Sequence, residues 1–258
     1  MYDAMKLTAQ CFIWIYLLTA AVCPVRAAGP PAVPPAIQKN YDDAKSRYRT
    51  HPHDDEAAWQ FAHACYDRAE FPRNDAERAA LADEGIEAAR KVIAHQPRLA
   101  AGHYFLGANL AELARTKTWG ALSLVRQMEK EWLMTLALDE NLDYGGADRN
   151  LGLLYRDAPP WPISVGNRGK AQWHLERAVK INAGYPENYL NLIESDMMWG
   201  KTAAATDAWN KLQALLPAAR KQYTGGYWEP SWNDWDSRAE KIQAALKTPR
   251  EPSTVHRR

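Results

Sequence analysis

LGLLYRDAPPWPISVGNRGKAQWHLERAVKINAGYPENYLNLIESDMMWGKTAAATDAWNKLQALLP, residues 151–217, is the stretch that decides the fold. Its apolar and small residues recur at steps of three and four, which places them on one face of an α-helix. A small residue on the first helix of each pair lets the second helix approach closely. The pattern predicts pairs of helices, each pair exposing an apolar face that the next pair must cover. The positions are Leu151, Gly152, Tyr155, Ala171, Leu175 and Ala178, then Tyr189, Leu192, Ile193, Gly200, Ala205, Trp209, Leu212 and Pro217.

This spacing resembles the tetratricopeptide repeat family over about residues 40–223, although the family period of about 34 residues is exceeded in every repeat. The fourth pair matches best, with Asp196 where the family has an aromatic residue. The two N-terminal pairs match more weakly, through Leu106, Gly107 and Ala137, and through Trp59, Ala62, Tyr66, Ala89 and Pro97. The resemblance implies an all-α, right-handed superhelical solenoid of about four helix pairs, a fold that usually binds other molecules rather than transforming them.

The rest of the chain extends the same plan. Residues 28–36 are rich in proline and predict an extended linker, and residues 37–247 predict one helical domain. A helix from about residue 231 to 247 is expected to cap the stack, and residues 248–258 to form a polar tail. The expected helices before it cover 37–50, 55–71, 75–95, 99–115 and 119–138, with further pairs over 145–181 and 186–223.

The N-terminus predicts export. An apolar run from Cys11 to Val22 follows Lys6, is too short to span a bilayer, and ends at Pro24 before a small-residue cleavage site at Ala27. We expect residues 1–27 to be a cleaved signal peptide, which leaves no membrane span and predicts a periplasmic or secreted protein. Lipidation of Cys23 is the alternative, but Val22 is large for the position before a lipidated cysteine.

Charge and cysteine content exclude several classes of protein. The formal net charge is +1, so no basic field indicates nucleic acid. Cleavage would leave Cys65 as the one remaining cysteine, inside an apolar helical stripe where a buried thiol is expected. A hydrolase would need Cys65 beside His63 or His103, and His63 lies on a different face of the same expected helix.

Candidate binding residues follow from the repeat, because the first helix of each pair lines the concave face. Arg149 and Arg156 are seven residues apart and share a helix face, where they could bind a carboxylate or phosphate. Alternatively they are solvated, or paired with Asp148 and Asp157. A groove site predicts that replacing both arginines by alanine weakens binding and leaves the melting temperature nearly unchanged. The full set is Phe61, Tyr104, Phe105, Arg149, Asn150, Arg156, Trp161, Asn191 and Glu194.

Trp161 belongs to the insertion Ala158–Gly166, the part of the chain least expected from the repeat. Its Pro-Trp-Pro sequence is similar to a loop in exported repeat proteins that resemble the T component of tripartite ATP-independent periplasmic transporters. That resemblance implies an accessory protein with a small-ligand pocket between the helices.

Motifs of catalysis or cofactor binding are missing from the sequence, so we expect no enzyme, cofactor or metal site. His51, His53, Asp54 and Asp55 fall in one turn without the further ligands that zinc requires. The turn with Trp228, Trp232 and Trp235 either stacks on a ligand or packs the last helix. The sequence therefore predicts a non-catalytic exported scaffold that binds a protein or peptide of the cell envelope in a concave groove. The alternative is a binding or transporter-accessory protein that encloses a small apolar ligand.

Overall fold

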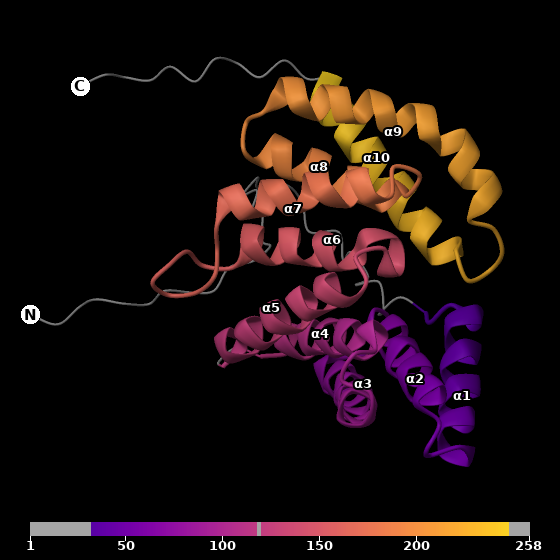
Figure 1. The fold of residues 1–258 in the computed structure, drawn as a ribbon. Coiled ribbons are helices and arrows are strands. Elements are labelled where there is room, and N and C mark those ends of the chain that lie inside the picture. Colours follow the sequence, from indigo (N-terminus) through magenta and orange to yellow (C-terminus); the bar gives the residue numbers. More distant parts are fainter. Residues whose placement is uncertain (1–31, 118–119, 248–258) are drawn as a thin grey trace, which may run out of the picture.

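Ten α-helices and no β-strand make up the part of the chain that the computed structural model describes, residues 32–117 and 120–247. Figure 1 shows them stacked in chain order from α1 to α9. The all-α prediction is confirmed. The helices are α1 Pro35–Thr50, α2 Asp55–Ala69, α3 Asp75–His95, α4 Ala100–Arg115, α5 Ala121–Leu138, α6 Leu142–Asp157, α7 Arg168–Ile181, α8 Pro186–Met198, α9 Thr202–Gln222 and α10 Glu229–Lys247.

The four expected pairs are α2 with α3, α4 with α5, α6 with α7, and α8 with α9. Asp54 and Asn74 cap α2 and α3, because their side chains accept backbone hydrogen bonds from the first turn of each helix. Helix α1 begins two residues before the predicted boundary, because Pro35 suits the first turn of a helix. Regular helix in α6 begins only after Gly145, because the three residues from Asp143 to Gly145 have positive φ.

Glycines set the close packing within two of the pairs. A Cβ atom on Gly107 would lie 2.5 Å from Trp132 Nε1, and one on Gly152 would lie 2.6 Å from Leu175 Cγ. Both contacts are far inside van der Waals distance. The small residue of the repeat pattern therefore has the role that the sequence predicts, which is to let the second helix approach the first.

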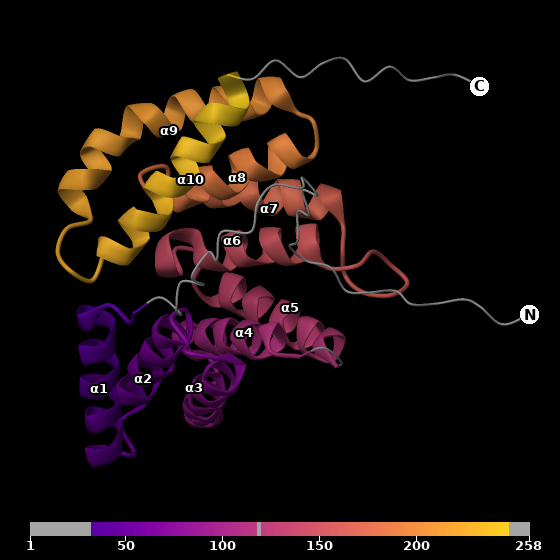
Figure 2. The same cartoon turned by 180° about the vertical axis from the view of Figure 1, so that it is seen from behind.

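Helix α10 returns along the inner row of helices. It packs on α8, the first helix of the last pair, and Figure 2 shows it crossing in front of α8 and α9. Trp235 and Ile242 are buried in this contact, within a cluster that includes Tyr185 and Tyr223. The predicted capping helix is present, and its N-terminal end points back toward α1 and α2.

None of the helices within the described residues is long and apolar enough to cross a membrane. The predicted signal peptide, the first four residues of the proline-rich linker (28–31) and the predicted tail lie outside the described residues.

Candidate functional site

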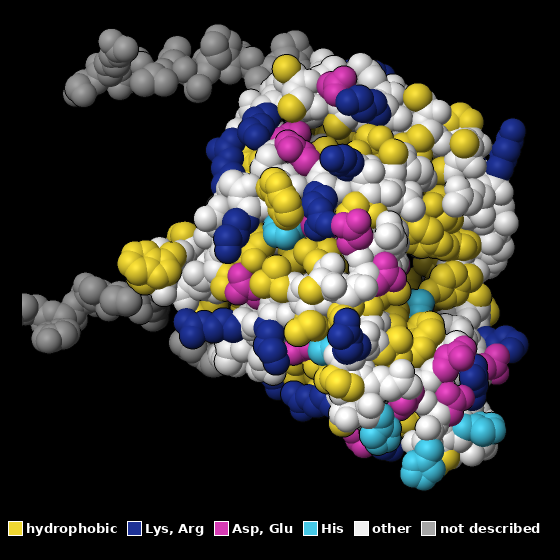
Figure 3. All heavy atoms as spheres, viewed as in Figure 1, with side chains coloured by type: hydrophobic (Ala, Val, Ile, Leu, Met, Phe, Trp, Pro, Cys, Tyr) yellow, Lys and Arg dark blue, Asp and Glu magenta, His cyan; other side chains and the backbone are white. Residues whose placement is uncertain are grey.

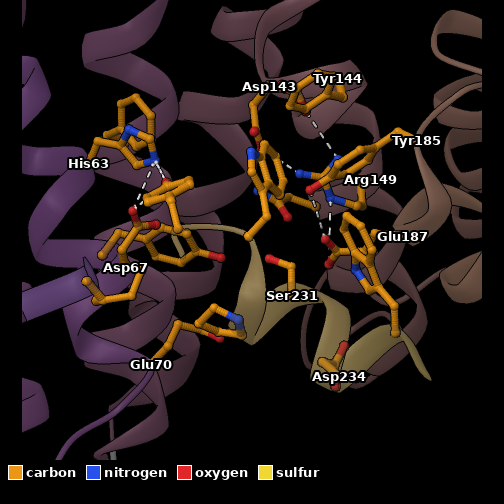
Figure 4. A pocket seen from close by; sticks show the side chains of 18 of the residues that line it. His63, Asp67, Glu70, Asp143, Tyr144, Arg149, Tyr185, Glu187, Ser231 and Asp234 are labelled. Atoms are coloured by element: carbon orange, nitrogen blue, oxygen red, sulfur yellow. Dashed lines mark hydrogen bonds and ion pairs between the residues drawn. The ribbon is translucent and has the colours of Figure 1, made fainter. Parts of the chain in front are cut away.

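A pocket of about 470 Å³ lies where the first helices of the four pairs face α10. Figure 4 shows its side chains converging from both sides, with Ser231 of α10 between Asp67 and Glu70 on one wall and Arg149 and Glu187 on the other. Its volume falls within the range of about 300–1,000 Å³ typical of small-molecule sites. The lining residues are Ile37, His63, Tyr66, Asp67, Glu70, Phe71, Tyr104, Phe105, Asp143, Tyr144, Arg149, Asn150, Tyr185, Glu187, Tyr227, Trp228, Pro230, Ser231, Asp234 and Trp235.

The segment around the start of α10 closes this pocket by bonding to α2. The Tyr227 hydroxyl donates a hydrogen bond of 2.7 Å to Asp67 Oδ2, and it lies 3.3 Å from His63 Nε2. Further along α10, Arg238 donates bonds of 2.8 Å to both carboxylate oxygens of Glu194 on α8. Because α10 is held at both of these places, it covers part of the concave face and forms one side of the pocket.

Arg149 joins the helices that form one wall. It is 5% exposed, and its Nη1 donates to the Asp143 carbonyl and to Asn188 Oδ1, each at 3.2 Å. Its Nη2 donates to Asp143 Oδ2, and the guanidinium lies 5.2 Å from the centre of the Tyr185 ring. Burial acts to lower the pKa of Arg149, but Asp143 and the other acidic neighbours outweigh it and raise that pKa. Arg149 is therefore a permanent charge committed to structural contacts.

The backbone is strained beside Arg149. Asp143 and Tyr144 have φ values of 50° and 58°, in the left-handed region that residues other than glycine rarely adopt. Side-chain contacts hold both residues there: Asp143 accepts from Arg149 and Tyr104, and the Tyr144 ring stacks on Tyr185 at 4.5 Å. Such conformations cost about 1–3 kcal/mol each and cluster at ligand sites. Here the strain places both side chains in the pocket wall.

The pocket is acidic. Among the described lining residues, five carry carboxyl groups, whereas Arg149 is the one lysine or arginine. Burial, and then the nearby Glu112, raise the pKa of Glu70 to about 7, although Arg115 acts to lower it. Burial also raises the pKa values of the Tyr104 and Tyr185 phenols, so both stay neutral at physiological pH. The carboxyl groups are those of Asp67, Glu70, Asp143, Glu187 and Asp234.

Four of the residues predicted from the sequence line the pocket: Tyr104, Phe105, Arg149 and Asn150. The first two are nearly fully buried in α4, and Asn150 Nδ2 donates to the Tyr104 hydroxyl at 3.3 Å. The structure thus brings together predicted residues from the second and third helix pairs.

The other predicted residues lie elsewhere. Phe61 is buried against Tyr48 of α1, with ring centres 5.1 Å apart. Asn191 and Glu194 do face α10, but both accept hydrogen bonds from Arg238. These two predicted groove residues are therefore already bound to the chain's own last helix.

Arg149 and Arg156 do not form a joint anion site. Arg156 donates to Asp157 Oδ1 at 2.6 Å and to Ser195 Oγ at 3.1 Å, outside the pocket. The alternative interpretation holds for Arg156, which pairs with Asp157, but it is wrong for Arg149, because Asp148 is bonded to His174 and Arg177 instead. The seven-residue spacing wrongly predicted a shared anion site. Arg149 is buried and donates its hydrogen bonds to residues of α4 and α8 instead.

Trp161 lies in the loop between α6 and α7, and it is 85% exposed. Ile163 of the same loop is 61% exposed, and Figure 3 shows apolar side chains projecting from the molecule where this loop lies. Trp161 and Arg126 of α5 line a second, smaller hollow. The insertion is thus a separate surface feature, away from the concave pocket.

Several pocket residues were missed by the sequence analysis. His63, Asp67 and Glu70 follow one another at steps of three and four along α2, a spacing that marks one helix face. Their proximity to Tyr227 depends on the return of α10, which no local pattern indicates. The sequence left two roles open for the Trp-rich turn, ligand stacking and helix packing, and the structure shows residues placed for each. Trp228 and Trp235 line the pocket, while the Trp232 indole donates to the Tyr223 carbonyl.

Cys65, His103 and the histidine turn offer no arrangement for catalysis or metal binding. Cys65 is 0% exposed, and burial raises the pKa of its thiol. His103 Nδ1 lies 2.6 Å from Glu131 and Nε2 lies 3.0 Å from the Pro97 carbonyl, so both nitrogens have partners. Within residues 32–117 and 120–247, no group of three or more His, Cys, Asp or Glu side chains is placed to hold a metal.

Comparison with solved structures supports this architecture. A thermophilic tetratricopeptide-repeat protein of Thermus thermophilus, TTC0263, superposes on 81% of the chain and 93% of its own length, with a TM-score of 0.59 and 17% identity. The chain has a tetratricopeptide-repeat fold. MamA aligns over 69% of the chain and 88% of its own length, with a TM-score of 0.48 and 16% identity. No family model and no curated protein sequence matches this repeat chain.

Proposed function

We propose that this chain is a non-catalytic exported binding protein that takes a compact ligand into its concave pocket. The observation that carries the proposal is the bond between Tyr227 and Asp67, which closes the concave face between α10 and α2. A long peptide would need an open groove, and α10 occupies that space along α8. The ligand is therefore a small molecule, or a single side chain of a partner protein in the cell envelope.

The composition of the pocket supports binding rather than chemistry. Nine of the twenty described lining residues are Phe, Tyr or Trp, and polar groups converge on the same space, as in typical ligand sites. Its one buried arginine is committed to Asp143 and Asn188, and its phenols are held in the neutral state.

Filling the pocket from α10 is expected to abolish binding. Ser231 lies in the middle of the pocket, so Ser231→Trp should occupy the ligand space, whereas Ser237→Trp places the same side chain on the exposed part of the same helix. Residues 28–258 of each variant would be exposed to fractionated envelope extract and examined by native mass spectrometry. We expect a bound mass on the unmodified chain and on Ser237→Trp, and its loss from Ser231→Trp.

Circular dichroism would verify that both variants fold, and Ser231→Met provides a milder block should the tryptophan variant misfold. Equal retention by all variants would place the ligand elsewhere, and no retention by any of them would overturn the proposal.

Export is the second part of the proposal, and it rests on the apolar run and cleavage site of residues 1–27. We expect the full chain, expressed in a Gram-negative bacterium, to appear in the periplasm with Ala28 as its first residue. N-terminal sequencing checks this. A chain that keeps Met1 in the cytoplasm would contradict export, and a lipid-modified Cys23 would replace cleavage at Ala27 by lipoprotein processing.

A further inference from the structure

We infer that the concave pocket recognises an organic cation, an alkylammonium or guanidinium group. The cation is either free or carried by a lysine or arginine side chain of a partner. This inference rests on the proposed binding function and specifies its ligand class. It follows from three features of the pocket: its excess of acceptors, the commitment of its one arginine, and its aromatic walls.

Carboxyl groups outnumber lysine and arginine side chains among the described residues around the space. Glu70 lies 3.5 Å from the Arg115 guanidinium, which favours the charged carboxylate and so opposes the effect of burial on its pKa. Glu187 accepts from the Tyr185 hydroxyl at 3.3 Å and lies 4.0 Å from Arg149 Nε. These carboxylates keep lone pairs directed at the pocket, and a ligand rich in N–H donors would satisfy them.

Binding of an anion is disfavoured because the hydrogen-bond donors of Arg149 are already engaged within the protein. Its two terminal nitrogens already donate to Asp143 and Asn188, and its face lies against the Tyr185 ring. An incoming carboxylate or phosphate would have to displace these bonds while facing Glu187 and Asp143 at close range. Like charges so placed repel.

Aromatic rings complete the recognition of a cation. Trp228 lines the pocket and meets Tyr144 edge-on, whereas the Tyr185 ring is already occupied by Tyr144 and the Arg149 guanidinium. Tyr66 and Tyr227 line the pocket as well, beside the acidic side chains of α2. Ring faces attract ammonium and guanidinium groups, most strongly where water is excluded. Both walls carry carboxylates and rings, with Asp67 beside Tyr227 on one and Glu187 beside Tyr185 on the other. Together they provide charge and shape for such a group.

Three probes with the same planar body and different charge test the inference. Isothermal titration would compare benzamidine, a cation, with neutral benzamide and anionic benzoate. We expect benzamidine to bind at least tenfold more tightly than benzamide, with benzoate weaker still. We also expect the affinity for benzamidine to fall as salt increases, since salt screens the attraction.

Removing pocket charge gives the matched comparison. Glu70→Gln combined with Glu187→Gln keeps the side-chain shapes and should weaken benzamidine binding at least tenfold. Glu56→Gln combined with Glu240→Gln removes two exposed carboxylates outside the pocket and should change the affinity for benzamidine less than twofold.

The source of the cation is distinguished by two further probes. Agmatine presents a free guanidinium, and acetyl-Gly-Arg-Gly-amide presents the same group within a peptide, with acetyl-Gly-Gln-Gly-amide as its neutral control. Preference for either cation over the neutral peptide supports the inference and identifies the source.

Equal affinity for benzamidine and benzamide, tighter binding of benzoate, or no binding of any cation would overturn the inference. Should probes bind without regard to charge and still be blocked by Ser231→Trp, the cation inference fails while the proposed binding function stands.

Discussion

Replacing Arg149 by alanine is expected to lower the free energy of unfolding by about 3–4 kcal/mol. The change removes the hydrogen-bond donor to Asn188 Oδ1, and Asn188 is 0% exposed, so a buried acceptor is left unsatisfied. It also removes one of the two side-chain donors to Asp143, whose left-handed backbone Arg149 helps to hold. Urea unfolding followed by circular dichroism measures the loss.

Arg156→Ala is the natural control. Arg156 pairs with its exposed neighbour Asp157 and with Ser195, so its loss should cost about 1 kcal/mol or less. Arg149→Lys keeps the positive charge but lacks the several donors of the planar guanidinium. It should therefore be more stable than Arg149→Ala and less stable than the unmodified chain. A nearly unchanged unfolding curve for Arg149→Ala would show that the buried network is absent. The sequence-based expectation that the double alanine variant stays stable is therefore replaced by a large loss from one position.

Gly152→Val is expected to destabilise the third helix pair by about 2–4 kcal/mol. The first atom of any side chain there would lie 2.6 Å from Leu175 Cγ and 3.2 Å from the Leu175 backbone nitrogen. Leu175 is 0% exposed, so its side chain has no free space to enter, and α6 and α7 must separate. Thermal unfolding measures the effect.

Gly184→Val is the matched comparison, because a Cβ there meets no atom closer than Asn182 Oδ1 at 3.6 Å. We expect it to change stability by less than about 0.5 kcal/mol. Equal effects at the two glycines would mean that Gly152 does not set the distance between the helices.

The sequence predicted the helix pairs well because repeat packing is local. Gly107 and Gly152 each face a residue on the very next helix, so the spacing that marks them also determines their contact. Capping residues such as Asp54 and Asn74 bond within a single helical turn, so helix boundaries of this kind can also be predicted from the local sequence.

The pocket was only half predictable. Tyr104 and Arg149 were found because the repeat assigns them to the concave face. Asp67 and Tyr227 are 160 residues apart, and their contact depends on α10 turning back along α8. The sequence analysis did not predict the burial of Arg149. That burial depends on the left-handed backbone at Asp143 and Tyr144, which brings the Asp143 carbonyl to the guanidinium, and a helical spacing pattern does not indicate such a turn.

A crystal structure of residues 28–258 with benzamidine tests the central claim most directly. We expect α10 to lie along α8, Tyr227 to bond Asp67, and the amidinium to sit between the aromatic rings and Glu70 or Glu187. An α10 that extends the stack beyond α9 and leaves the concave face open, or a ligand bound outside this pocket, would contradict the account.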